Sequence, residues 1–173
     1  MAKIKFTKNA LREQQQKLHQ LENYLPTLQL KKKLLQVEVS NAKASIEKLE
    51  KEFEKEKSNL ENFSYLFTDK KNSDILKYAE VEHIDKTYEN IAGVEIPKFE
   101  KVVFKEESYM LFDTPIWMDV ALKKLKDAIS IRQNILVEEE KKEALSKELR
   151  DVSIRVNLFE KILIPRFLKN IKK

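Results

Sequence analysis

The 173-residue chain contains no cysteine and a single glycine, Gly93. Without cysteine the chain forms no disulfide and offers no thiolate to a metal ion, which fits a reducing compartment. One glycine is too few for a fold built on many tight turns, and it excludes a phosphate-binding loop of the G-x-x-x-x-G-K-[ST] kind. The sequence also lacks an apolar run near 18 residues and a hydrophobic segment at its start. We therefore expect neither a membrane span nor a signal peptide.

Charged residues are abundant and of both signs. They make up 36% of the chain, with 34 basic and 29 acidic side chains and a net charge of +5. Lys, Glu and Leu dominate, which is typical of long helices and coiled coils. Because Glu and Lys are evenly mixed, most of the charge is expected on solvated helix faces, and we expect no nucleic-acid partner.

The segment 1–67 carries an apolar heptad repeat that begins at Leu11, after a plausible N-cap at Thr7. Position a holds Leu11, Leu18, Leu25, Lys32, Val39, Ile46, Phe53, Leu60 and Phe67, and position d holds Gln14, Leu21, Leu28, Leu35, Ala42, Leu49, Glu56 and Phe63. Only Gln14, Lys32 and Glu56 are polar. A 3.5-residue period over this length predicts a coiled-coil helix.

A second heptad occupies 114–173, where Asp113 or Thr114 can cap a helix and Pro115 suits its first turn. Position a holds Ala121, Ala128, Ile135, Lys142, Leu149, Val156 and Leu163, and position d holds Lys124, Ile131, Glu138, Leu145, Val152, Phe159 and Arg166. The repeat is clearest from Leu145 to Leu163 and weakest from Glu138 to Lys142.

The segment between the two helices, 68–113, differs from them in composition. "SDILKYAE" predicts a short helix capped by Ser73, and the β-branched and aromatic residues around Gly93 predict a β-hairpin with Pro97 on an edge. The expected fold is therefore dominated by α-helix: a long antiparallel two-helix coiled coil with a small middle insert that contains a β-hairpin. A parallel homodimer is the alternative, but two similar helices on one chain favour pairing within the chain.

No catalytic or metal-binding constellation is evident, and we expect no cofactor. His19 lies at heptad position b and is expected on the surface. His83 lies near Glu82 and Asp85, which is weak support for a metal site. The run "VEEEKKE" is better explained as a solvated helix face with local ion pairs.

Apolar side chains away from the heptad seam are the candidate partner contacts. In the first helix these are Leu30, Leu34 and Val37, beside the basic run Lys31, Lys32 and Lys33. In the second helix Met118, Leu122, Leu125, Ile129 and Leu136 form a stripe beside the seam. For the apolar residues of the second helix, and for Trp117, packing against the insert is an equally good explanation. For those of the first helix, which lie far from the insert, a partner protein explains the pattern better. Pro26 removes a helical hydrogen bond and is expected to bend the first helix.

Three segments resemble the D subunit of the V-type and archaeal A-type rotary ATPases and ATP synthases. They are "ENYLPTLQLKKKLLQ", "ENIAGVEIPKFEKVVF" and "RVNLFEKILIPRFLKNIKK", and "KIKFTKN" at the start is similar as well. The three segments occur in the family's order and on the same elements, and the resemblance covers nearly the whole chain.

The resemblance implies a non-catalytic rotor, the central-stalk shaft that couples the catalytic hexamer to the membrane ion-translocating ring. Its implied partners are the catalytic A and B subunits, the F subunit of the stalk, and the membrane-rotor adaptor, which is the C (or d) subunit. It implies a cytoplasmic location, peripheral to the membrane, with no direct membrane insertion and no bound cofactor. Family members usually continue beyond the I-P-R segment, whereas this sequence stops at Lys173.

Two other classes fit parts of the pattern. A prefoldin-like chaperone also joins two long helices through β-hairpins, and it would form a large oligomer. A basic coiled-coil arm on RNA would bind with a steep salt dependence, but the mixing of Glu with Lys argues against it.

Overall fold

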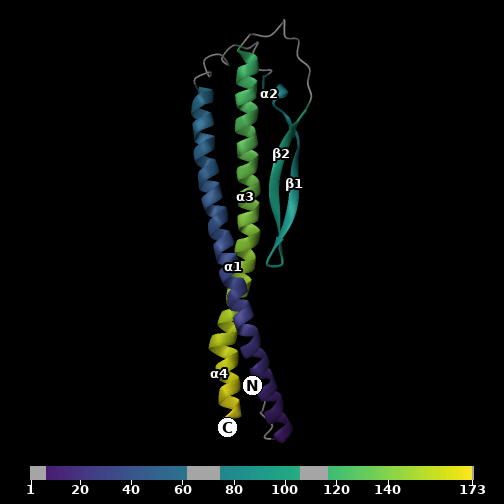
Figure 1. Ribbon diagram of the computed structural model, residues 1–173, viewed down its shortest axis with the longest axis vertical. Helices are drawn as coiled ribbons and strands as arrows, with labels where there is room; N and C mark the ends of the chain where they lie inside the picture. The colour runs from purple at the N-terminus through teal and green to yellow at the C-terminus, as the bar shows by residue number, and fades with distance from the viewer. Residues whose placement is uncertain (1–6, 62–74, 106–116, 173) are drawn as a thin grey trace. The chain divides into compact units, whose positions relative to one another are not determined.

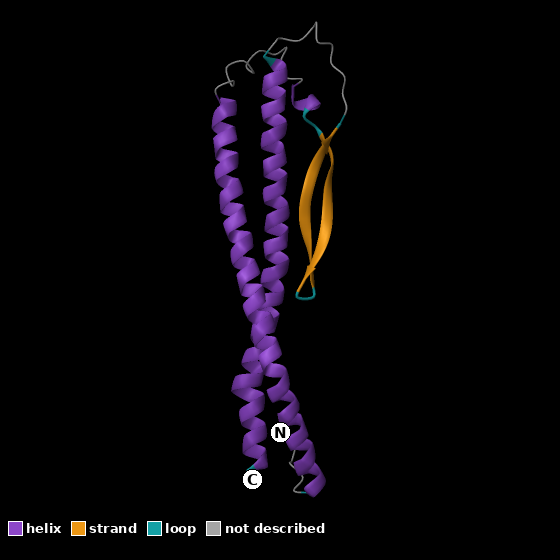
Figure 2. Ribbon diagram, in the orientation of Figure 1, coloured by secondary structure: helices purple, strands orange, loops and turns teal. Residues whose placement is uncertain are grey.

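The computed structural model describes residues 7–61, 75–105 and 117–172. Along the chain these residues form α1 (Lys8–Glu61), α2 (Ile75–Tyr78), β1 (Val81–Ile91), β2 (Val94–Phe104), α3 (Met118–Leu158), the π-helical turn η3 (Phe159–Leu163) and α4 (Ile164–Ile171) (Figures 1 and 2). Two long helices thus flank one β-hairpin, which confirms the predicted fold class. The expected boundaries at 67/68 and 113/114, the caps Ser73, Asp113 and Thr114, Pro115, and the heptad residues Phe63 and Phe67 lie outside the described residues.

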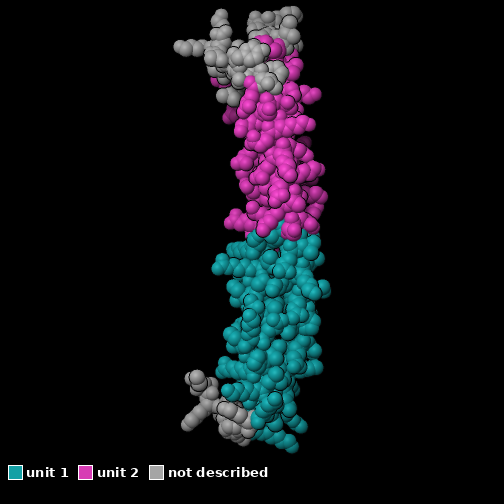
Figure 3. All heavy atoms as spheres, turned by 90° about the vertical axis from the view of Figure 1, so that its left-hand side faces the viewer, with its two compact units in different colours: residues 1–39, 145–173 teal, residues 40–144 magenta. Residues whose placement is uncertain are grey.

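The chain divides into two compact units, coloured separately in Figure 3. Unit 1 contains residues 1–39 and 145–173, and unit 2 contains residues 40–144. Both α1 and α3 contribute to each unit, so each unit has its own stretch of paired helix.

In unit 1 the first part of α1 runs antiparallel to the last part of α3 (Figure 1). Thr7 caps α1 as predicted, because its Oγ1 accepts a hydrogen bond from the Ala10 N–H at 3.3 Å. Leu35 and Leu145 are fully buried in this unit. The helix continues through Pro26 without interruption, and the bend expected there stays a prediction.

The buried residues of α1 follow the predicted heptad. Among the described a and d positions of α1, only Leu11 is exposed, at 41%. In unit 2, two of the polar exceptions face each other, because Lys124 Nζ lies 3.9 Å from Glu56 Oε2. Gln14 is half-buried, and its Oε1 atom has no hydrogen-bond partner among the described residues. The seam is therefore mostly apolar and continuous within each unit.

The heptad prediction fails after Leu163. In η3 the Ile164 N–H donates to the Phe159 carbonyl, five residues back, so the turn contains an extra residue and rotates everything that follows. Arg166, expected at position d, is exposed, while Phe167 and Ile171 are half-buried in its place. Pro165 gives a physical reason, since it has no N–H and its ring would clash with the carbonyl four residues back in a regular α-helix.

In unit 2 the β-hairpin forms where it was predicted. Ile91 pairs with Val94, which leaves a two-residue turn at Ala92 and Gly93. Both turn residues have positive φ, 53° and 82°, which is the geometry of a type I′ turn. Pro97 lies in β2 of a two-stranded sheet, where every strand is an edge strand, as expected.

The insert packs onto α3 within unit 2. Ala79, just after α2, is buried in a cluster with Met118, Ala121 and Leu122 of α3. The hairpin is held along the same helix by Lys86, whose Nζ lies 2.7 Å from Glu140 Oε2. Val137 is 1% exposed although it lies off the seam. It lies three residues before Glu140, which pairs with Lys86 of the hairpin.

Candidate partner-binding surfaces

The first stripe consists of Leu30, Leu34 and Val37 on α1 in unit 1. Steps of four and three residues place these side chains on one helix face. They are 69%, 47% and 55% exposed, so they point away from the seam as the sequence predicted. Three large apolar side chains in line on one face are unusual unless something covers them.

The three lysines beside this stripe differ in their surroundings. Lys31 Nζ lies 2.6 Å from Glu148 Oε1 on α3, and both side chains are about 30% exposed. Lys32 occupies its seam position half-buried, whereas Lys33 is exposed. The run that looked uniform in the sequence therefore supplies one interhelical ion pair, one seam residue and one outward cation.

The candidate residues of α3 have a different environment. Met118 and Leu122 are 5% and 6% exposed, and the half-buried Leu125 and Ile129 pack against the same cluster. Trp117 is also half-buried and packs there. The broadened core beneath the insert, which the sequence left open as an alternative, accounts for these side chains. A role for them in partner contacts stays a prediction.

A second stripe escaped the sequence analysis. Ile154 and Leu158 on α3 and Ile162 in η3 are 57%, 39% and 55% exposed. Their regular spacing of four residues was a usable signal. It was overlooked because the neighbouring heptad seam, with Val152, Val156 and Phe159, dominates the apolar pattern of this segment.

The two units carry opposite net charge. Unit 1 contains sixteen basic and six acidic residues, a net charge of +10, whereas unit 2 contains eighteen basic and twenty-three acidic residues, a net charge of −5. The modest total of +5 therefore conceals a strong asymmetry. A unit with this positive charge attracts acidic surfaces at long range and speeds its encounter with them.

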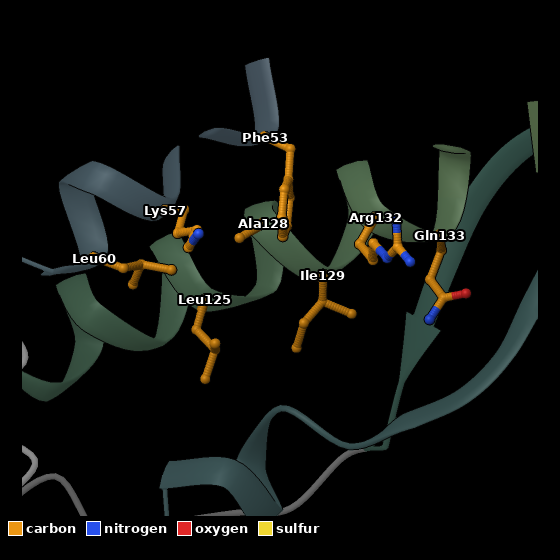
Figure 4. Close-up of a pocket in the computed structure, with 8 residues that line it drawn as sticks. All are labelled: Phe53, Lys57, Leu60, Leu125, Ala128, Ile129, Arg132 and Gln133. Carbon is orange, nitrogen blue, oxygen red and sulfur yellow. The ribbon is translucent and has the colours of Figure 1, made fainter. Parts of the chain in front are cut away.

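A groove of about 260 Å³ lies between α1 and α3 in unit 2 (Figure 4). Its lining residues are Phe53, Lys57, Leu60, Leu125, Ala128, Ile129, Arg132 and Gln133. The lining is mostly apolar and includes no carboxylate, histidine or hydroxyl side chain. The polar side chains that line it are Lys57, Arg132 and Gln133.

The remaining polar clusters lie on the surface. His19 is exposed, as predicted, and its Nε2 lies 3.2 Å from Asn23 Nδ2. His83 Nε2 lies 3.3 Å from Asp85 Oδ1, and Asp85 also contacts the Lys101 ammonium through its other oxygen. Over the described ranges, no three His, Cys, Asp or Glu side chains are grouped to hold a metal ion. Nor does any helix in these ranges have an apolar stretch long enough to cross a membrane.

One cross-strand ion pair on the hairpin has a clear electrostatic effect. Lys98 Nζ lies 2.7 Å from Glu89 Oε1. The hydrogen bond from Lys98, reinforced by its charge, lowers the pKa of the Glu89 carboxyl. The same hydrogen bond and charge raise the pKa of Lys98. Both side chains are exposed, so the pair is a local feature of the hairpin surface.

These features define a class of protein: a two-helix coiled coil with a β-hairpin insert, whose exposed apolar stripes and basic unit are candidate surfaces for partners. The chain belongs to the family of ATP synthase D subunits, whose sequence model matches residues 10–173. It is similar to the V-type ATP synthase D subunit of Chlamydia abortus, with 42% identity over 173 residues that cover 99% of this chain and 83% of the relative. The corresponding protein of Chlamydia pneumoniae is 43% identical over 171 residues, which cover 98% and 82%.

Membership of this family makes the chain a subunit of an ATP synthase complex, and thus a component of an enzyme. It favours the D-subunit interpretation over the prefoldin-like and RNA-binding alternatives, since the match extends across helices and insert together.

Proposed function

We propose that this chain is the non-catalytic central-stalk rotor of a V-type or A-type ATP synthase, transmitting torque between the catalytic A/B hexamer and the membrane ion-translocating ring. The observation that carries the proposal is the seam between its two long helices. Leu35 and Leu145 are both fully buried there, and Val152 and Val156 continue the apolar contact along α3 in unit 1. Torque transmission requires such an element, because two helices locked through side-chain packing resist fraying and bending better than one.

The proposal places unit 1 inside the ring of A and B subunits. Its net charge of +10 suits contact with acidic loops, and the first stripe supplies apolar surface for the same contact. Lys33 lies exposed beside that stripe and is the natural cation for it. Unit 2, with the hairpin, is then the part that binds the F subunit of the stalk and the membrane-rotor adaptor, the C (or d) subunit. The complex would lie on the cytoplasmic side, peripheral to the membrane.

Co-purification tests this proposal. The chain should be co-expressed with the A, B and F subunits from the same source, and complexes separated by size-exclusion chromatography with light scattering. We expect one copy of the chain per A/B hexamer and a stable one-to-one complex with F. Failure to associate with either F or the hexamer would contradict the proposal, and a large homo-oligomer would revive the chaperone interpretation.

A further inference from the structure

The second stripe is bounded by arginine at both ends. The four-residue step that joins Ile154, Leu158 and Ile162 extends backward to Arg150 and forward to Arg166, and both arginines are exposed. In a regular α-helix a four-residue step overshoots one turn of 3.6 residues, so such a stripe drifts around the helix. The wider turn in η3 counteracts that drift between Leu158 and Ile162. The π-helical turn therefore helps to keep the stripe on one face.

The acidic side chains of this segment are largely engaged elsewhere. Glu148 pairs with Lys31 of α1, and the Glu160 carboxylate accepts a hydrogen bond from the Gln29 amide. Asp151 is the remaining acid and is exposed. In contrast, no ion-pair partner within the described part of the chain is seen for the cations of this segment, which are Arg150, Arg155, Lys161 and Arg166. Contacts with α1 thus hold two carboxylates, and the cations are left available around the stripe.

We propose that the second stripe docks an acidic amphipathic segment of a partner subunit, apolar at its centre and with a carboxylate near each end. Arg166 lies sixteen positions after Arg150, which corresponds to about 24 Å along the helix. Each arginine fork binds a carboxylate through two parallel hydrogen bonds, so the two ends fix the orientation of the segment. The inference rests on the proposed function, because the partner is a subunit of the ring around unit 1.

Charge argues against a second copy of this chain as the occupant. Two copies placed stripe to stripe would bring Arg150, Arg155, Lys161 and Arg166 of each into mutual proximity. Like charges that are brought together and desolvated oppose association. A segment rich in carboxylates meets no such penalty. The partner that fits this surface is therefore a different and acidic one.

The test compares three forms of the full-length chain for binding to a reconstituted A/B complex. The first is the natural chain, and the second carries Ile154→Gln, Leu158→Gln and Ile162→Gln. Gln is a good helix former at an exposed position, so helicity should be retained. The third is the matched control, Val120→Gln with Tyr88→Gln, which removes two large side chains that are 51% and 60% exposed in unit 2. We expect the triple variant to bind about tenfold more weakly or worse, and the control to bind within about twofold of the natural chain.

A separate arm removes charge and keeps the apolar stripe. Arg150→Gln with Arg166→Gln should weaken binding at low salt and flatten its dependence on ionic strength. This arm also tests the inference if the triple variant loses helicity in circular dichroism. An arginine variant with unchanged affinity and unchanged salt dependence would contradict the inference.

The remaining outcomes separate the inference from the function on which it rests. If the natural chain does not bind the A/B complex, the proposed function fails. If the natural chain and the triple variant bind equally well, only the inference fails. If the natural chain forms a dimer that the triple variant abolishes, the stripe is a self-association surface and the proposed occupant is wrong.

Discussion

Lys31 of α1 and Glu148 of α3 form the closest ion pair between the long helices among the described residues of unit 1, with 2.6 Å between Nζ and Oε1. The contact crosses the antiparallel pair beside the fully buried Leu35 and Leu145. It links the basic run of the first helix to the second, so one of the three lysines is explained by the fold alone. Lys32 is half-buried in the seam, so the exposed Lys33 and the first stripe are the candidates for partner contacts.

The ion pair gives the first prediction. Lys31→Met, Glu148→Gln and the double variant form a cycle in which the coupling energy between the two side chains should be about 1 kcal/mol, because both are partly shielded from water. Urea unfolding followed by circular dichroism measures it. Additive effects of the two single changes would show that the pair contributes nothing to stability.

Neighbouring leucines in α1 should respond in opposite ways to truncation. Leu35 is 0% exposed, so Leu35→Ala should cost about 2–5 kcal/mol of unfolding free energy through lost burial and a cavity. Leu34 is 47% exposed, and Leu30→Ala with Leu34→Ala should change stability and helicity little. The double variant should instead weaken docking into the A/B hexamer. If it destabilised the isolated chain as much as Leu35→Ala does, the first stripe would be core.

Replacing Ala92 by glycine should stabilise the hairpin turn. Ala92 has φ 53°, a region that costs a residue with a Cβ atom about 1 kcal/mol. Ala92→Gly should therefore strengthen hydrogen-exchange protection of the hairpin amides. The matched control is Ala44→Gly at an exposed position inside α1, which should destabilise by about 1 kcal/mol. Weaker protection in Ala92→Gly would contradict the turn geometry.

The Glu89–Lys98 pair predicts a pH dependence of hairpin stability. Because the pKa of Glu89 is lowered in the fold, its contribution is present above the unfolded glutamate pKa and is lost as pH falls through the folded value. Because the pKa of Lys98 is raised, its contribution is present below the unfolded lysine pKa and is lost as pH rises through the folded value. The pair thus acts fully between about pH 4.3 and 10.4. In an NMR titration, Lys98→Gln should return the pKa of Glu89 toward its ordinary value, and an unchanged titration would show that the pair does not form.

The sequence anticipated the features that depend on periodicity and on single decisive residues. The two heptads predicted which face of each long helix is buried, from Leu18 onward in the first and as far as Leu163 in the second. Burial of one face follows directly from a 3.5-residue apolar repeat. Gly93 located the hairpin turn, because a two-residue type I′ turn needs positive φ. The π-helical turn was missed, and with it the outward rotation of Arg166. The wider turn before Pro165 does not alter the apolar spacing from which the heptad was assigned. Whether the stripe beginning at Met118 was core or surface could not be decided from the sequence, because it depended on where α2 folds back.

The measurement that tests the rotor account most directly is single-molecule rotation. The A/B hexamer would be fixed to a surface through its A subunits, and a bead attached to the hairpin through a cysteine introduced at Thr87, which is exposed. The natural chain has no other cysteine, so labelling is specific. The account predicts that the bead rotates in one direction when ATP is added and stops when it is removed. A bead that stays fixed relative to the hexamer while ATP is hydrolysed would contradict it.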